Sequence, residues 1–192
     1  MGTGVASTSY QDTFFASGRD DWATPEALFQ AIQAQYGPFD HDVAAQRRTR
    51  KVQSYLGPDH PNPHRRDALR VKWHGNCWCN PPYGRGITEK WVRYAWHQAW
   101  VGNGSSALLV PSRTSAGWFN RYVLRADRVV FLIGRVSFDD FNSAPFDSLV
   151  AIFNKREVPE GADRGMWDLD RLPVFDTMYV PKEARYRGDE EE

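Results

Sequence analysis

Short apolar runs alternate with amphipathic stretches along most of this chain, and this alternation restricts its fold more than any other feature. Each run is a few residues long and is bounded by polar or turn-forming residues, as is typical of buried strands. The five runs are Phe39–Val43, Cys77–Cys79, Ala107–Val110, Val129–Ile133 and Leu149–Phe153. Strands that alternate with helices predict an α/β fold with a mainly parallel sheet and helices on both faces. No clear helix separates the last two runs, so the final strand can be antiparallel.

Helical signals fill the intervals between these runs. Thr24 is a favourable N-cap residue, Pro25 suits the first helical position, and Gly37-Pro38 would end this first helix. Further helices are expected at the start of residues 46–66, ahead of a long Pro-rich loop, after an N-cap at Thr88, and over residues 115–126. Tryptophans recur at helical spacing after Thr88, which is more typical of a helix that covers a sheet than of a ligand site.

The length and composition predict one folded domain. The chain has 192 residues, of which 41% are hydrophobic, enough for a single full-sized core. We expect this domain over residues 21–180, with a flexible Gly- and Ser-rich segment at 1–20 and a disordered acidic tail at 181–192. No apolar run approaches the roughly 20 residues that cross a bilayer, and no signal peptide is visible, which indicates a cytoplasmic protein without a membrane partner.

Positive charge is concentrated in the middle of the chain. Residues 41–135 contain 16 Lys and Arg against 5 Asp and Glu, although the whole chain has a formal net charge of zero. Two clusters stand out: Arg47, Arg48, Arg50 and Lys51, and then Arg65, Arg66, Arg70 and Lys72. Such clusters suit a phosphate backbone, so DNA or RNA is the expected partner, while a merely solvated basic surface is the alternative.

The segment Asn80-Pro81-Pro82-Tyr83 carries the clearest chemical signal. It follows a predicted strand, and ligands of open α/β sheets bind beyond the carboxyl ends of strands. The Asn80 side chain and a main-chain carbonyl held rigid by proline can accept both hydrogens of an –NH2 group. This would localise the nitrogen lone pair toward an electrophilic methyl, while Tyr83 offers a face on which a planar base can stack. The alternative is a rigid turn that only ends the strand.

Cys77 and Cys79 lie two residues apart on one predicted strand, so their side chains point to the same face. A disulfide between them would be strained, and reduced thiols are the expected state. His74 is close in sequence, but a fourth ligand is not evident, so no metal site is expected.

Taken in order along about residues 20–153, a set of short motifs resembles the phage-type DNA N6-adenine methyltransferase family. Each piece is weak alone, and Asn-Pro-Pro-Tyr after a strand is the most specific of them. The pieces are Asp21-Trp22, Thr24-Pro25, Phe39 to Ala45, Asp67-Ala68-Leu69, Trp73, Asn80 to Gly84, Leu109 to Thr114, Gly134 to Phe138, and Ala144-Pro145-Phe146.

The resemblance implies a Rossmann-like S-adenosylmethionine-dependent methyltransferase fold and a set of site residues. Asn80, Pro81, Pro82 and Tyr83 would hold the target amine. The cofactor S-adenosyl-L-methionine would be bound by Thr24, Pro25, Asp42, Ala44, Ala45 and Asp67. Arg113 would reach DNA or the flipped base. If the chain is encoded by a phage, its location would be the host cytoplasm.

Several of these roles have structural alternatives. Asp42 could be a turn residue, Asp67 could cap a helix, and Arg113 could form a surface salt bridge. Arg135 and Phe138 could simply close a turn between two strands. The Asn-Pro-Pro-Tyr motif also occurs in methyltransferases that act on RNA adenine or protein glutamine. A non-catalytic DNA-binding relative on the same fold is a further alternative.

The chain departs from the family pattern in two places. His41 stands where an apolar residue is more usual, and residues 57–66 are unusually rich in Pro and His. The ribose contact, expected near the end of a second strand, therefore has no assigned residue. The chain leaves little room for a separate target-recognition domain, so base preference is expected to come from the loops 57–72, 84–88 and 112–118.

Overall fold

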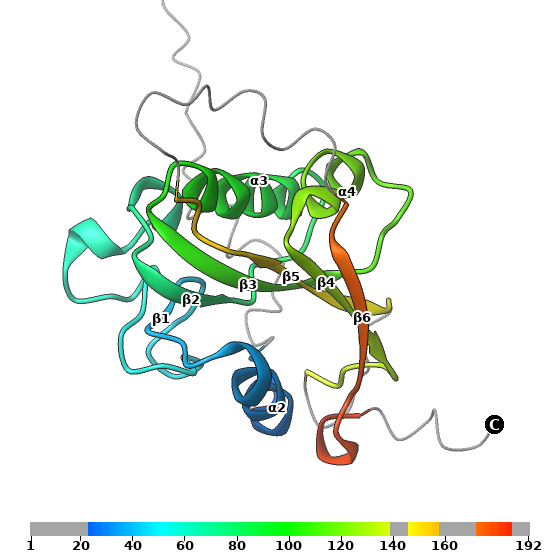
Figure 1. Cartoon of the computed structure of the whole chain (residues 1–192). Helices are drawn as coiled ribbons and strands as arrows, with labels where there is room; N and C mark the ends of the chain where they lie inside the picture. Colours follow the sequence, from blue (N-terminus) through cyan, green and yellow to red (C-terminus); the bar gives the residue numbers. More distant parts are fainter. Residues whose placement is uncertain (1–22, 139–145, 158–171, 186–192) are drawn as a thin grey trace, which may run out of the picture.

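The computed structural model describes residues 23–138, 146–157 and 172–185, and it contains a six-stranded mixed sheet (Figure 1). The strand order is β1-β2-β3-β5-β4-β6. The strands are β1 (His41–Asp42), β2 (Gly75–Cys79), β3 (Gly104–Pro111), β4 (Arg128–Ile133), β5 (Ser148–Phe153) and β6 (Val174–Tyr179). All five predicted apolar runs contribute to this sheet.

The sheet is mainly parallel, as predicted. β1 pairs in parallel with β2, β2 with β3, and β4 with β6. β5 is antiparallel to both of its neighbours, β3 and β4, which confirms the expectation for the final apolar run. β6 was not predicted. It is an edge strand with mostly exposed side chains, so its sequence lacks the continuous apolar run of a buried strand.

Helices pack on both faces of the sheet, as expected. α2 (Glu26–Tyr36) covers one face, and α3 (Ile87–Trp100) and α4 (Gly117–Arg121) cover the other (Figure 1). Each face has its own core of buried side chains, in which α2 packs around Trp78 and α3 packs over Cys77 and Cys79. The two cysteines are buried, reduced and on the same face, as the strand pattern predicted.

Both predicted N-caps are wrong, Thr24 by one residue and Thr88 by two. α2 begins at Glu26, and the capping position is taken by Pro25, whose extended backbone accepts a hydrogen bond from Phe29 N. Thr24 therefore lies outside the helix. α3 follows Gly86, whose φ of 74° is the left-handed conformation that glycine tolerates. Thr88 is inside the helix, and its hydroxyl accepts from Gly84 N.

The helix expected within residues 46–66 is absent. Backbone amides of this segment donate to side chains instead, from Gln46 N to Thr49 Oγ1, from Arg47 N to Asp59 Oδ2, and from Lys51 N to Asp42 Oδ2. Amides bonded in this way are not available for the hydrogen bonds of a helix. The next helical elements along the chain, before β2, are two 3-10 turns, η1 (Pro63–Arg65) and η2 (Ala68–Arg70). The helix expected over 115–126 is split into α4 and the 3-10 turn η3 (Val123–Arg125).

The predicted disordered tail begins too early. Residues 182–184 form the 3-10 turn η4 (Lys182–Ala184), and Ala184 is buried against the sheet. Its carbonyl accepts from Ser137 N, and Arg185 bridges to Val136. The segment 1–22 and residues 186–192 lie outside the described part of the chain. Among the described residues, no helix is long and apolar enough to cross a membrane.

Candidate active site

The carboxyl ends of β1, β2 and β3 meet at one rim of the sheet, because the three strands are parallel neighbours. Asp42 ends β1, Asn80 follows β2, and Arg113 follows β3 by two residues. Residues that are far apart in sequence are thus brought to one rim. This is the rim at which α/β sheets bind their ligands.

Asn80 and Tyr83 are linked directly by a hydrogen bond. The Tyr83 hydroxyl donates to Asn80 Oδ1 at 2.6 Å and lies 3.1 Å from the carbonyl oxygen of Leu109 on β3. Burial raises the pKa of Tyr83 well above its usual value, so the hydroxyl keeps its proton. One proton serves two acceptors, and a rotation of the hydroxyl can move it from Asn80 to Leu109.

Two phenylalanines fix the ring of Tyr83. The edges of Phe138 and Phe146 lie against it, with ring centroids 6.1 and 5.4 Å away and interplanar angles of 67° and 86°. Edge-to-face packing of this kind is favourable and holds a ring in one orientation. Both phenylalanines belong to the short motifs of the resemblance, with a simple turn as the alternative for Phe138, but the sequence does not indicate their contact with Tyr83. Their contact with Tyr83 depends on the return of the chain through β4 and β5.

Asp42 holds the loop that follows β1. Its side chain is buried, Oδ2 accepts from Lys51 N at 2.9 Å, and Oδ1 accepts from Ala44 N at 3.4 Å. Burial raises the pKa of Asp42 to about 6, although the two backbone hydrogen bonds act to lower it. Burial therefore disfavours the ionised form of Asp42. Carboxyl groups with a raised pKa are more common at functional sites than elsewhere.

A small hollow lies beside this loop, at the carboxyl end of β1. It contains two of the predicted cofactor residues, Ala44 and Ala45, with apolar neighbours from nearby loops, from η2 and from α3. The described residues that line it are Val43, Ala44, Ala45, Leu56, Gly57, Pro58, Arg66, Ala68 and Trp91. Gly57 is required here, because a Cβ atom at this position would lie 1.6 Å from the carbonyl oxygen of Ala45.

The second strand expected near the cofactor exists only as a short bridge. Asp42 N donates to Ser54 O and Leu56 N donates to Asp42 O, so residues 54–56 run parallel to β1 on its outer side. Asp59 is the first acidic residue after this bridge. The sequence did not reveal the bridge because Tyr55-Leu56 is too short to register as a strand.

Asp42 and three other predicted cofactor residues do not line the hollow. Asp67 caps η2 by accepting from Leu69 N at 3.0 Å, and it also forms an ion pair with Arg70 at 3.3 Å. Thr24 is buried and Pro25 starts α2. The start of α2 is tied to the loop after β1 by the ion pair between Glu26 and Lys51, at 2.9 Å.

His41, the residue that departs from the family pattern, binds the unusual loop. Its Nδ1 lies 2.7 Å from Ser54 Oγ, which also accepts from Arg65 Nη2 at 3.0 Å. Burial, and then the nearby charge of Arg65, lower the pKa of His41, so the neutral ring is favoured. Ser54 Oγ thus joins the His41 ring to Arg65 of the 57–66 loop, so the two departures from the family pattern form one structural unit.

Several cations border the rim. Arg113 and Arg85 are exposed after β3 and β2, and neither forms an ion pair with any residue of the described chain. Arg47 and Arg50 lie in the loop after β1. Two members of the predicted basic clusters are neutralised within the protein, Lys51 by Glu26 and Arg70 by Asp67.

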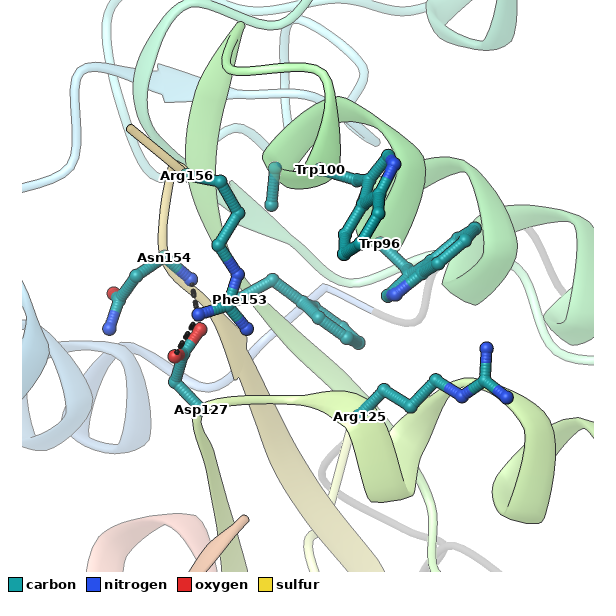
Figure 2. Close-up of a pocket in the computed structure, with 8 residues that line it drawn as sticks. Trp96, Trp100, Arg125, Asp127, Phe153, Asn154 and Arg156 are labelled. Atoms are coloured by element: carbon teal, nitrogen blue, oxygen red, sulfur yellow. Dashed lines mark hydrogen bonds and ion pairs between the residues drawn. The ribbon is translucent and has the colours of Figure 1, made fainter. Parts of the chain in front are cut away.

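A second hollow lies at the opposite rim, at the amino end of β4 (Figure 2). Trp96 and Trp100 of α3 line one side, and Asp127 reaches toward Arg156 on the other. The carboxylate of Asp127 pairs with Arg156 at 3.1 Å and accepts from Asn154 N at 2.8 Å. These contacts join α3, β4 and β5, so this hollow is part of the scaffold and not of the site.

The described residues contain no cluster of three His, Cys, Asp or Glu side chains that could hold a metal ion. Burial raises the pKa of Cys77 to about 12 and raises that of Cys79 well above its ordinary value, so neither thiol is poised to lose its proton. The chemical groups gathered at the active rim are an amide, a phenol, a buried carboxylate and main-chain carbonyls.

The mixed, mostly parallel sheet with helices on both faces is consistent with a methyltransferase-like fold. The family described as DNA N-6-adenine-methyltransferase (Dam) matches residues 11–159. The chain belongs to this family of DNA adenine methyltransferases. A "DNA N-6-adenine-methyltransferase" of Escherichia phage T1 is 24% identical over 175 residues, which cover 85% of this chain and 69% of that protein. The resemblance of the short motifs is thereby confirmed.

Proposed function

We propose that this chain transfers a methyl group from S-adenosyl-L-methionine to N6 of an adenine flipped out of DNA, on a Rossmann-like methyltransferase fold. The observation that carries the proposal is the position of the Asn80 amide oxygen at the carboxyl end of β2, within hydrogen-bonding reach of a donor. Family membership supports the adenine specificity, which the four residues from Asn80 to Tyr83 do not define by themselves.

The target amine would bind through acceptors of the Asn80–Tyr83 segment. Asn80 Oδ1 would accept one N6 hydrogen and a main-chain carbonyl at Pro81 or Pro82 the other. The Tyr83 proton, which Asn80 Oδ1 accepts in this structure, would then turn to the carbonyl oxygen of Leu109. Holding both hydrogens draws the N6 lone pair out of conjugation and directs it at the methyl carbon.

The residues at the end of β1 fit the cofactor. The hollow beside Ala44 and Ala45 is lined mostly by apolar residues, with Arg66 as the one charged member, and an adenine ring would pack against apolar residues of this kind. S-adenosyl-L-methionine, when bound, supplies an electrophilic methyl on a positively charged sulfur. Thr24 and Pro25 would line its methionine end, Asp42 would fix the loop, and Asp59 is a candidate for the ribose hydroxyls. Asp67 would accept from the adenine amine of the cofactor with a lone pair that Leu69 N and Arg70 leave unused.

DNA would lie across the rim that holds Asn80. Arg113 and Arg85 are exposed there and are available for phosphate contacts. Because N6 of a stacked adenine is inaccessible, the base must leave the helix, and Tyr83 would receive it on its face. The edge-to-face contacts with Phe138 and Phe146 would keep the Tyr83 ring in its orientation.

Labelled S-adenosyl-L-methionine and unmethylated DNA test the proposal directly. Nuclease digestion should yield N6-methyladenine with the native chain and none with Asn80→Ala. Asn154→Ala, an exposed asparagine at the opposite rim, is the matched control and should remain active. Label found in RNA, in protein or in cytosine would contradict the adenine assignment. Failure to bind S-adenosyl-L-methionine would indicate a non-catalytic relative.

A further inference from the structure

The last described segment of the chain, residues 180–185, lies against the turn that follows β4. Ser137 N donates to Ala184 O at 3.0 Å, and an isolated antiparallel bridge pairs Val136 with Arg185. The family match ends at residue 159, so this segment lies beyond the matched part of the chain. The turn after β4 is therefore supported by residues that the family match does not include.

Arg185 fastens this segment to the turn with its side chain. Its Nη2 donates to Val180 O at 2.9 Å, which closes residues 180–185 into a compact turn. Gly134 follows β4 with a φ of 95°, and a Cβ atom there would lie 3.0 Å from Arg185 Nε. Glycine adopts this left-handed conformation easily and leaves room for the Arg185 stem. The main chain of Gly134 therefore rests on the Arg185 side chain.

Phe138 follows the bridged residues directly and connects them to the active site. Its side chain is buried, and its ring packs edge-to-face with Tyr83, with the two ring centroids 6.1 Å apart. Val180 and Ala184 are buried in the same core as Phe138, and Tyr83 packs against this core. A displacement of residues 136–137 would therefore move Phe138 and release one of the contacts that orient the Tyr83 ring.

We propose that Arg185 is a positioning residue for the target base, because it holds Phe138, and through it Tyr83, in the orientation on which a flipped adenine stacks. This rests on the proposed function and deepens it, since it gives a segment beyond the family match a part in base binding. Arg185 acts on the base only through these contacts. Phe146 also packs on Tyr83, so loss of Arg185 should weaken base binding without abolishing it.

Steady-state methylation of unmethylated DNA by the full chain measures the effect. Arg185→Ala should lower kcat/KM for DNA about fivefold, while the Kd for S-adenosyl-L-methionine in calorimetric titration stays unchanged. Arg185→Met keeps the stem under Gly134 but lacks the donor to Val180 O, so it should lower kcat/KM about threefold and serves if Arg185→Ala does not fold. Lys182→Ala removes an exposed cation of the same segment and should keep the native kcat/KM.

A double-mutant cycle with Phe138→Leu shows whether the effect passes through Phe138. In the Phe138→Leu background, Arg185→Ala or Arg185→Met should lower kcat/KM by less than about twofold, because the contact that Arg185 supports is already lost. Independent, multiplicative losses would overturn the inference, and so would a native kcat/KM in the Arg185 variants.

Two further outcomes are informative. A less steep dependence of DNA affinity on salt in Arg185→Ala would show that Arg185 binds phosphate directly, which would also overturn the positioning role. Absence of methylation by the native chain would contradict the proposed function itself, and this inference with it.

Discussion

Asp42 makes the stability of the protein depend on pH in an unusual direction. Its carboxyl is buried, and burial raises its pKa from the ordinary value of 3.8 to about 6. Between these two values the folded state holds a proton that the unfolded state has already released. Raising the pH through this window therefore favours the unfolded state.

The size of the effect follows from the shift. About two pKa units correspond to about 3 kcal/mol of unfolding free energy, lost in full once the pH exceeds 6. Roughly 2 kcal/mol of this is lost between about pH 4.5 and 7.5, because the unfolded chain is already ionised at the lower end. Asn does not titrate, so the unfolding free energy of Asp42→Asn should not show this loss between about pH 4.5 and 7.5.

Urea unfolding followed by tryptophan fluorescence measures this, since Trp73 and Trp78 are buried in the core. The difference in unfolding free energy between Asp42→Asn and the native chain should grow by about 2 kcal/mol from about pH 4.5 to 7.5. Asp59→Asn, which changes an exposed carboxyl in the neighbouring loop, should show no such growth. A difference for Asp42→Asn that is the same at both pH values, within about 0.5 kcal/mol, would refute the reasoning.

Three further perturbations follow from the contacts. Tyr83→Phe keeps the stacking ring but loses the hydroxyl that orients Asn80, so kcat should fall about fivefold while DNA affinity is unchanged; a loss of DNA binding would contradict this. Arg113→Ala should lower the slope of log affinity for DNA against log salt by about 1, and an unchanged slope would place Arg113 outside the DNA interface. Asp127→Ala removes the acceptor of Arg156 and should lower Tm by roughly 10 °C in thermal unfolding, with little effect on methylation below that temperature.

Much of the sheet was predictable because buried strands carry a local signal. The five apolar runs needed no tertiary information, and the antiparallel direction of β5 followed from the missing helix before it. β6 and the bridge at residues 54–56 were not predicted, for two different reasons. β6 is exposed and thus not apolar, and the bridge is too short to show a period.

The helix boundaries were less predictable, because several side chains can satisfy the same backbone groups. Thr24 and Thr88 are both good caps by residue type, yet Pro25 and Gly86 occupy those positions. The segment after Ala45 has no helix because Asp42 and Asp59, each distant in sequence, accept its backbone amides.

For the site, the sequence by itself determined the chemical groups and their order along the chain: an amide and a phenol three residues apart, held by two prolines at the end of a strand. The tertiary structure decided what surrounds them. Phe138 and Phe146 reach Tyr83, and the loop of Arg66 faces Ala45, only because strands from distant parts of the chain end at neighbouring positions. Local residue preferences extend over a few positions, whereas these contacts are set by the order of strands in the sheet.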